Sequence, residues 1–187
     1  MSKPTFEQTE EFYGQVKSGR ITRENLQAFL RNPDQFVSRF PTTFDQALGL
    51  PKLIQLAVGK KNIANINTNI TPERFKLAVT GVRTVALELA TFLDNETGEQ
   101  AAKRLVSEGY TLENTGELAG FLRQYPAEVE KYYAVLALGE DSRWTGPSGD
   151  VVVPYAYVVG AVRSFDLDWF GSRFYSDYRV LVSRPSK

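Results

Sequence analysis

Apolar and polar residues recur with different periods along the chain. In the first part, apolar positions three or four residues apart predict amphipathic helices over 5–18 and 22–31. A further helical segment is expected over 41–49, where Gly49 and Pro51 would end it. These patterns predict a helical N-terminal region.

An asparagine-rich stretch follows, in which Asn alternates with Ile, Ala and Thr. This composition makes a poor helix and a weak strand. One interpretation is a binding loop, and the simpler one is a connector. The predicted organisation is therefore a helical region over 1–60, a linker over 61–72 and a main domain over 73–187.

From residue 73 onward, alternating apolar residues and short helical patterns mix. The order of these segments predicts an α+β domain. Strands are expected over 74–79, 83–93 (a segment also compatible with a helix), 129–139, 151–167 (broken at Pro154 or Gly160) and 178–182; helices are expected over 98–109 and 114–126, and turns over 140–150.

The bulk composition narrows the classes of function. The 187 residues carry no net charge, which gives no general argument for a nucleic-acid or anionic-membrane partner. No apolar run is long enough to span a membrane, and the N-terminus lacks the pattern of a signal peptide. The chain contains neither Cys nor His, which argues against thiolate chemistry, Ser–His triads and most zinc sites. No feature indicates a cellular location.

Acidic residues supply two candidate sites. Asp166 and Asp168 are two residues apart, so on a strand both carboxylates point to one face. They could form a catalytic pair or half of a calcium site, but a solvated strand face with Phe165 and Leu167 on the buried side is the simpler interpretation. The turn region holds Glu140, Asp141 and Asp150 without the spacing of an EF-hand loop. No metal and no cofactor is therefore expected.

Basic and aromatic residues interleave near the C-terminus, as in proteins that bind single-stranded nucleic acid. Three aspartates in the same stretch would repel phosphates, so nucleic acid is not the expected partner. The residues concerned are Arg163, Arg173, Arg179 and Arg184, with Trp169, Tyr175 and Tyr178, and the aspartates are Asp166, Asp168 and Asp177.

The C-terminal segment divides into two sets of residues. A frame set of large apolar and turn residues could hold a small β core: Val153, Pro154, Tyr155, Val158, Gly160, Phe165, Leu167, Phe170, Phe174, Val180, Leu181 and Val182. A gap set lies between them: Ala156, Tyr157, Val159, Ala161, Val162, Ser164, Asp166, Asp168, Trp169, Gly171, Ser172, Arg173, Tyr175, Ser176, Asp177 and Tyr178. The gap set is dominated by Tyr, Ser, Asp, Gly, Ala and Val, a composition close to that of antibody paratopes.

Four residue types are missing from this segment. Residues 1–150 contain 8 Lys, 14 Glu, 8 Gln and 1 Met. At that frequency, residues 151–186 would hold about seven residues of these types, yet they hold none. Low strand propensity explains part of the deficit, but strands at a protein surface use Lys and Gln freely.

The segment "YYAVLALGEDSRW…VPYAYVVGAVRSFDLDWFGSRFYSDYRVLVSR" resembles the C-terminal ends of variable proteins from diversity-generating retroelements of bacteria, archaea and phages. In that family an error-prone reverse transcriptase rewrites adenines, mostly in asparagine codons, and these changes cannot yield Lys, Glu, Gln, Met or Trp. The resemblance therefore implies a genetic cause for the missing residue types. Trp169 is the one gap residue that this route cannot produce.

The resemblance implies a fold and a function. Residues 73–187 would form a C-type-lectin-like domain with a small, mostly antiparallel sheet and a variable segment over about 151–182. The protein would be a non-enzymatic binder of a protein or other macromolecule, contacted by the gap set, with Tyr157, Tyr175 and Tyr178 as the main anchors. Alternatives are a module for one fixed partner or a homo-oligomer, a His-free hydrolase that uses Asp166 and Asp168, and a nucleic-acid-binding module.

Overall fold

Two compact units, Met1–Ser38 and Arg39–Lys187, make up the chain. The structure, a computed structural model, describes residues 6–24, 26–27, 38–77 and 81–184. In the first unit, α1 (Phe6–Lys17) confirms the first predicted helix. Residues 23–24 and 26–27 are also helical, as predicted, and residues 28–31 of that second helix lie outside the described part.

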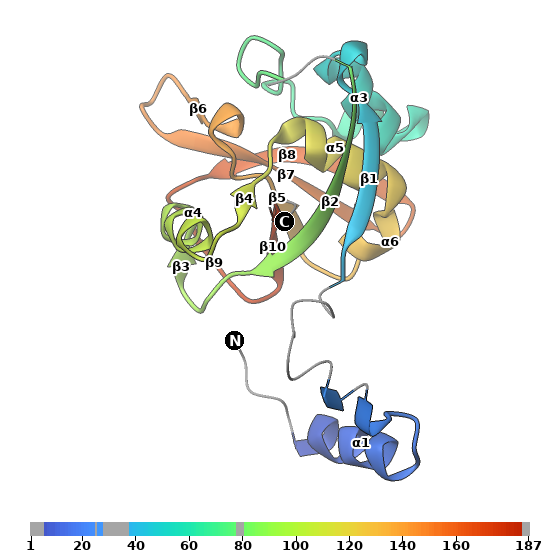
Figure 1. Cartoon of the computed structure of the whole chain (residues 1–187). Helices are drawn as coiled ribbons and strands as arrows, with labels where there is room; N and C mark the ends of the chain where they lie inside the picture. Colours follow the sequence, from blue (N-terminus) through green and yellow to red (C-terminus); the bar gives the residue numbers. More distant parts are fainter. Residues whose placement is uncertain (1–5, 25, 28–37, 78–80, 185–187) are drawn as a thin grey trace. The chain divides into compact units, whose positions relative to one another are not determined.

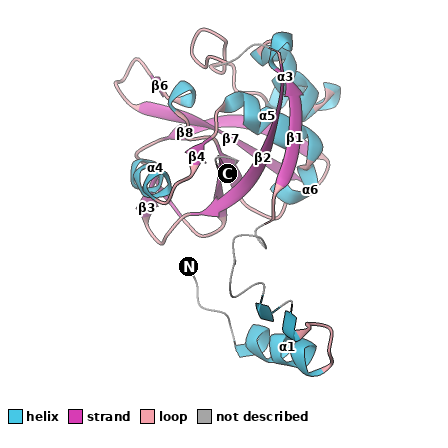
Figure 2. Ribbon diagram, viewed as in Figure 1, coloured by secondary structure: helices cyan, strands magenta, loops and turns pink. Residues whose placement is uncertain are grey.

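The second unit is built around an eight-stranded mixed sheet, so the predicted α+β class is confirmed. Its strand order is β1-β2-β10-β5-β7-β6, with β4 also paired to β10 and β8 to β7. β10 runs parallel to β5, and the other described strand pairs are antiparallel. Figure 2 shows the strands in magenta and the helices in cyan. The strands of this sheet are β1 (Phe40–Asp45), β2 (Val82–Thr91), β4 (Thr111–Leu112), β5 (Ala134–Leu136), β6 (Trp144–Thr145), β7 (Val151–Val159), β8 (Val162–Trp169) and β10 (Tyr178–Ser183), and a separate pair is formed by β3 (Glu96–Thr97) and β9 (Arg173–Phe174).

Helices cover both faces of this sheet. Figure 1 shows α4 to one side of β4 and β10, and α3 with α5 to the other. The helices of the second unit are α3 (Leu50–Val58), α4 (Gly98–Ser107), α5 (Thr115–Gln124) and α6 (Pro126–Val129), with short 3-10 helices η2 (Gln46–Leu48), η3 (Lys60–Asn65) and η4 (Glu140–Ser142). Within the described residues, no helix has the length and apolar character needed to cross a membrane.

The helix predicted over 41–49 is wrong. Most of that segment forms β1, which pairs with β2, and only η2 follows it. Thr42 and Phe44 are buried while Pro41 and Thr43 are exposed, which is the period of two of a strand that rests one face on a core. A short strand whose partner lies some 40 residues away along the chain leaves no distinctive local pattern.

The segment after β1 also differs from the predicted end of the N-terminal helical region. Pro51 was expected to end a helix, but it lies in the first turn of α3, where its missing N–H leaves no hydrogen bond unmade. α3 buries Leu50, Leu53 and Ile54 against the same core as α5. The observed division therefore falls after Ser38, because β1 and α3 both belong to the second unit.

Residues of the predicted linker are attached to the edge of the sheet. Ile66 forms an isolated bridge with Phe165 of β8, and the backbone N–H of Asn67 donates to the Phe165 carbonyl at 2.9 Å. The strand predicted over 74–79 does not form within its described residues 74–77. The segment thus connects α3 to β2 while it extends the pairing of β8.

Most other predicted elements are confirmed. α4, α5, β2 and β10 lie where the sequence predicted them, and the strand expected over 129–139 shortens to β5 because α6 precedes it. Of the two proposed breaks in 151–167, Gly160 is the real one: it has φ of 59° in the turn between β7 and β8, whereas Pro154 lies within β7.

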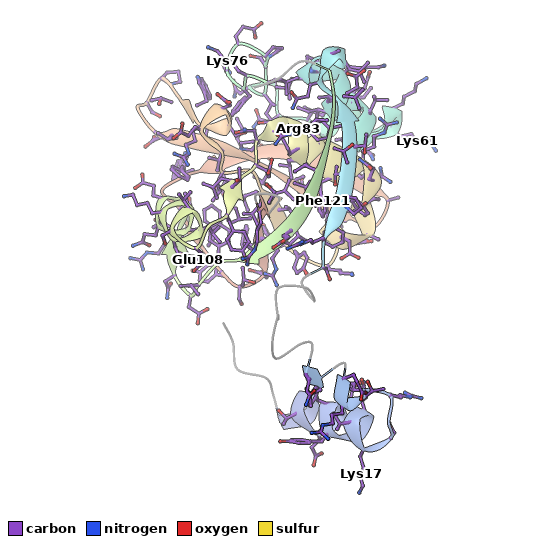
Figure 3. The ribbon with its side chains drawn as sticks, viewed as in Figure 1. Lys17, Lys61, Lys76, Arg83, Glu108 and Phe121 are labelled. Atoms are coloured by element: carbon purple, nitrogen blue, oxygen red, sulfur yellow. The ribbon has the colours of Figure 1, made fainter. Side chains whose placement is uncertain are left out.

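Alternate residues of the central strands enter two separate cores. Leu181, Val135, Ala156 and Phe165 pack with α3 and α5 in one cluster, around residues such as Phe121, which Figure 3 labels. Val180, Val182, Leu136 and Val153 pack on the other face with α4, Phe92, Phe170 and Phe174. The two clusters fix the direction of every side chain on β5, β7, β8 and β10.

Candidate functional site

The frame set supplies much of the buried interior. Leu167 and Tyr155 of this set are half-buried against the two cores, and Gly160 is exposed in its turn. The other nine are buried: Val153, Pro154, Val158, Phe165, Phe170, Phe174, Val180, Leu181 and Val182. The frame set, which was defined from residue types alone, therefore corresponds largely to buried side chains.

Most of the gap set lies at the surface, with two exceptions. Ala156 is buried in the core beneath α5, on the face of the sheet opposite to Tyr157. Ser164 lies on the same face as Tyr157 but is only 2% exposed. These two residues therefore contribute no exposed surface, contrary to their inclusion among the contact residues. The other fourteen are half-buried or exposed: Tyr157, Val159, Ala161, Val162, Asp166, Asp168, Trp169, Gly171, Ser172, Arg173, Tyr175, Ser176, Asp177 and Tyr178.

Strand register brings the tyrosines of β7 and the aspartates of β8 onto one face. Tyr155 lies opposite Asp166, and Val153 lies opposite Asp168. Directly opposed residues of antiparallel strands point to the same side, so Tyr155, Asp166 and Asp168 share a face. This arrangement confirms that the two aspartates project together, with Phe165 on the buried side.

Six residues form what we call the aromatic–acidic face: Tyr133, Tyr155, Tyr157, Asp166, Asp168 and Tyr178. The rings of Tyr155 and Tyr157 are stacked, with centroids 5.7 Å apart and an interplanar angle of 26°. Those of Tyr133 and Tyr178 are 4.8 Å apart. The sequence analysis did not identify Tyr133, which precedes β5, and it assigned Tyr155 to the frame set. The spacing could have indicated Tyr155: it is two residues from Tyr157, just as Asp166 is two residues from Asp168.

Hydrogen bonds hold the two carboxylates in place. Oδ1 of Asp166 accepts from the side-chain amide of Asn67 at 2.6 Å and from the backbone N–H of Leu167 at 2.8 Å. The Tyr155 hydroxyl donates to Oδ2 of Asp166 at 3.5 Å. Oδ1 of Asp168 accepts from the backbone N–H of Trp169 at 2.7 Å. Each carboxylate is therefore oriented chiefly through one of its two oxygens.

The phenol groups of Tyr155 and Tyr178 remain neutral over the physiological range. Burial raises the pKa of Tyr155 well above its usual value, and the charge of Asp166 adds to the effect. Burial raises the pKa of Tyr178 to about 12, with Tyr133 and Asp168 contributing. Both hydroxyls can therefore donate hydrogen bonds at neutral pH.

Two of the arginines interleaved with these aromatics, Arg163 and Arg179, are engaged elsewhere. Nη1 of Arg163 donates to the Ala57 carbonyl at 3.2 Å, and Arg163 lies opposite Val158, whose side chain is buried on the other face. The Arg179 guanidinium stacks 4.1 Å from the ring centroid of Tyr132. Arg163 and Arg179 therefore do not contribute their charges to the aromatic–acidic face.

A pocket of about 410 Å³ adjoins the aromatic–acidic face. Three gap residues, Trp169, Gly171 and Ser172, line it together with Glu99 and residues 149–151. The Ser172 hydroxyl donates to Oδ1 of Asp168 at 3.3 Å, which links the pocket wall to the face. Trp169 is 63% exposed, so its ring is available for contact with a ligand.

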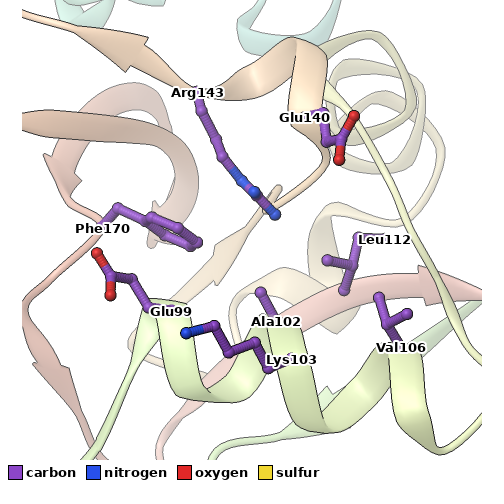
Figure 4. Close-up of a pocket in the computed structure, with 8 residues that line it drawn as sticks. All are labelled: Glu99, Ala102, Lys103, Val106, Leu112, Glu140, Arg143 and Phe170. Carbon is purple, nitrogen blue, oxygen red and sulfur yellow. The ribbon is translucent and has the colours of Figure 1, made fainter.

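A second pocket, of about 420 Å³, lies between α4 and η4 (Figure 4). The Arg143 guanidinium there stacks over the Phe170 ring at 4.6 Å and donates twice to the Leu138 carbonyl. Burial lowers the pKa of Arg143, and Glu140 and Glu99 offset part of that effect. Arg143 thus stabilises the loop after β5 through its hydrogen bonds to Leu138. Glu140 and Glu99 balance its positive charge.

The acidic turn region shows no grouping of metal ligands. Glu140 and Asp141 form the first turn of η4, whereas Asp150 accepts a hydrogen bond from Ser148 at 2.8 Å. Throughout the described ranges, no group of three or more His, Cys, Asp or Glu residues has a geometry that could hold a metal ion.

Comparisons with protein-family models, with curated proteins and with solved structures found no match to this chain.

Proposed function

We propose that this protein is a non-enzymatic ligand-binding protein that displays diversified side chains on a C-type-lectin-like scaffold, as variable proteins of diversity-generating retroelements do. One observation carries the proposal: the segment without Lys, Glu, Gln and Met is also the segment whose residues divide into a buried frame set and an exposed gap set. A rewriting mechanism would account for the missing residue types. The same segment also presents most of its gap residues at the surface, where a ligand could contact them.

The packing supports diversification at these positions. The frame residues of β7, β8 and β10 enter two cores that hold the backbone, while fourteen gap residues contribute chiefly to the surface. Substitutions at exposed positions that lack structural contacts change stability by about 0.5 kcal/mol or less. The scaffold can therefore accept many different side chains at the nine exposed gap positions.

The sequences of near-identical copies of the gene, with their genomic neighbourhoods, test this proposal. We expect differences concentrated at the exposed gap positions, beside a reverse transcriptase gene and a repeat of the variable segment. Ala156 and Ser164, which are buried, should vary less than Tyr157 and Tyr175. Differences spread evenly along the chain would contradict diversification.

A module for one fixed partner is the second candidate function. The observation that favours it is the position of Tyr133 and Tyr155, which lie outside the gap set yet form part of the aromatic–acidic face. Large rings at the centre of a surface are typical of binding hot spots. If copies of the gene keep Tyr157, Tyr175 and Tyr178 unchanged, this candidate replaces the first.

A further inference from the structure

We infer that the aromatic–acidic face binds a protein segment through a cationic side chain, lysine or arginine, that is inserted among the tyrosine rings. The inference rests on the proposed ligand-binding function and adds the chemistry that the ligand must present. Three features of the face support it: its charge, the faces of its rings and the carboxylate oxygens that remain open.

The charge of the face is negative. Asp166 and Asp168 are its charged members, and within the described residues no lysine or arginine forms an ion pair with either of them. Of the arginines close to them in sequence, Arg163 and Arg179 are held by Ala57 and Tyr132, whereas Arg173 is exposed on β9. A cation from a partner would therefore meet two carboxylates that form no ion pair and for which Arg163 and Arg179 do not compete.

The rings add a second attraction for a cation. A lysine or arginine placed over a tyrosine ring is attracted by the negative face of the π system, most strongly where water is excluded. Tyr155 and Tyr157 are half-buried and stacked, and Tyr178 is packed between Tyr133 and Phe174. The arrangement thus offers several ring faces next to two carboxylates.

The open carboxylate oxygens disfavour other ligands. Among the described residues, Oδ2 of Asp168 has no hydrogen-bond donor, and Oδ2 of Asp166 has only the long bond from Tyr155. An apolar ligand would remove these oxygens from water without replacing the lost hydrogen bonds. An anionic ligand, such as a phosphate backbone, would be repelled by both carboxylates.

The extent of the exposed surface indicates a macromolecule. Nine gap residues are exposed, from Val159 and Val162 beside the turn between β7 and β8 to Tyr175, Ser176 and Asp177 after β9. A free metabolite would use a small part of this surface, whereas a protein segment can lay a cationic side chain on the rings and contact the flanking residues.

Selection of displayed random peptides on the full chain tests the inference. We expect the selected peptides to be enriched in Arg and Lys, and to lose about tenfold in affinity when that Arg is replaced by citrulline, which keeps the shape without the charge. The double variant Asp166→Asn, Asp168→Asn should weaken the same peptides by a similar factor. Oδ1 of Asn can still accept the hydrogen bonds that Oδ1 of each aspartate receives, and its NH2 group can donate to the Tyr155 hydroxyl, so the fold is retained.

Asp94→Asn is the matched control, because Asp94 is exposed in the turn after β2 and outside the face; peptide affinity should not change. Peptides whose binding requires Tyr157 but tolerates citrulline and the double variant would overturn the inference and leave the binding function intact. If no selected peptide loses affinity with Tyr157→Ala, both the inference and the proposed binding surface are wrong.

Discussion

Tyr155 of β7 lies directly opposite Asp166 of β8, and its hydroxyl donates a 3.5 Å hydrogen bond to Oδ2 of that carboxylate. The pair joins the two strands at the centre of the aromatic–acidic face. Because a phenolate would meet the charge of Asp166 at close range, the pair also sets how this face responds to alkaline pH.

Asp166→Asn should lower the pKa of Tyr155, although burial will still keep it above the usual value. Removal of a nearby negative charge makes ionisation of the phenol less unfavourable. NMR titration of tyrosines labelled at Cζ measures this change. Tyr178 is the internal control, because Asp166 does not contribute to its raised pKa. An unchanged pKa of Tyr155 would contradict the contact.

Val158→Ala and Val159→Ala should have very different effects on stability. The two residues are neighbours on β7, but Val158 is 7% exposed and Val159 is 68% exposed. We expect Val158→Ala to lower the free energy of unfolding by about 2 kcal/mol and Val159→Ala to change it by less than about 0.5 kcal/mol. Urea unfolding of both variants measures the difference, and equal losses would contradict the division into frame and gap sets.

Gly98→Ala should destabilise the second unit because α4 begins against the backbone of Phe170. A Cβ atom at residue 98 would lie 2.5 Å from the Phe170 carbonyl oxygen and 2.9 Å from its Cδ2. Relief of that overlap should cost about 2 kcal/mol. Thermal unfolding measures the loss. Gly146→Ala is the control, since the nearest atom to its Cβ would be 3.7 Å away, and a loss of the same size there would refute the steric explanation.

Features with a short-range pattern could be predicted from the sequence. The shared face of Asp166 and Asp168 follows from the two-residue period of a strand, and the sequence limited the break between β7 and β8 to Pro154 or Gly160. α4 and α5 have apolar residues at helical spacing between clear start and stop signals. The strand pattern therefore placed the gap residues of β7 and β8 on strands without the structure.

Features that depend on distant partners could not be derived in this way. Tyr133 precedes β5, and its contact with Tyr178 exists only because β10 pairs in parallel with that strand from far along the chain. Ala156 has the residue type of a variable position, but the core beneath α5 determines its burial. In each case the decisive contact is made by residues remote in sequence.

A pair of buried glutamates should make the stability of the second unit depend on pH. Glu113 and Glu117 are each 1% exposed and share Arg83, which forms an ion pair with both. Burial and the charge of Glu113 outweigh the attraction of Arg83 and raise the pKa of Glu117 to about 7. Burial also raises the pKa of Glu113. Near neutral pH, the folded state therefore binds protons that the unfolded chain releases.

The sign of the effect follows from these shifts. Because the pKa of Glu117 is higher in the folded state, its protonated form favours folding, and this contribution is lost as the pH rises from about 4.5 through about 7. We expect the free energy of unfolding to fall over that interval. Glu117→Gln, which imitates the protonated group, should stabilise the protein by about 2 kcal/mol at about pH 8 and have little effect at about pH 5.

Urea unfolding at both pH values, with Glu130→Gln as the control, tests this prediction. Glu130 is exposed at the end of α6, so its substitution should leave the pH dependence of the parent chain unchanged. If Glu117→Gln destabilises the protein at the higher pH, the ion pair with Arg83 outweighs burial, and Glu117 is ionised in the folded state. A parent chain whose stability rises over the same interval would lead to the same conclusion, because it would place the proton uptake in the unfolded chain.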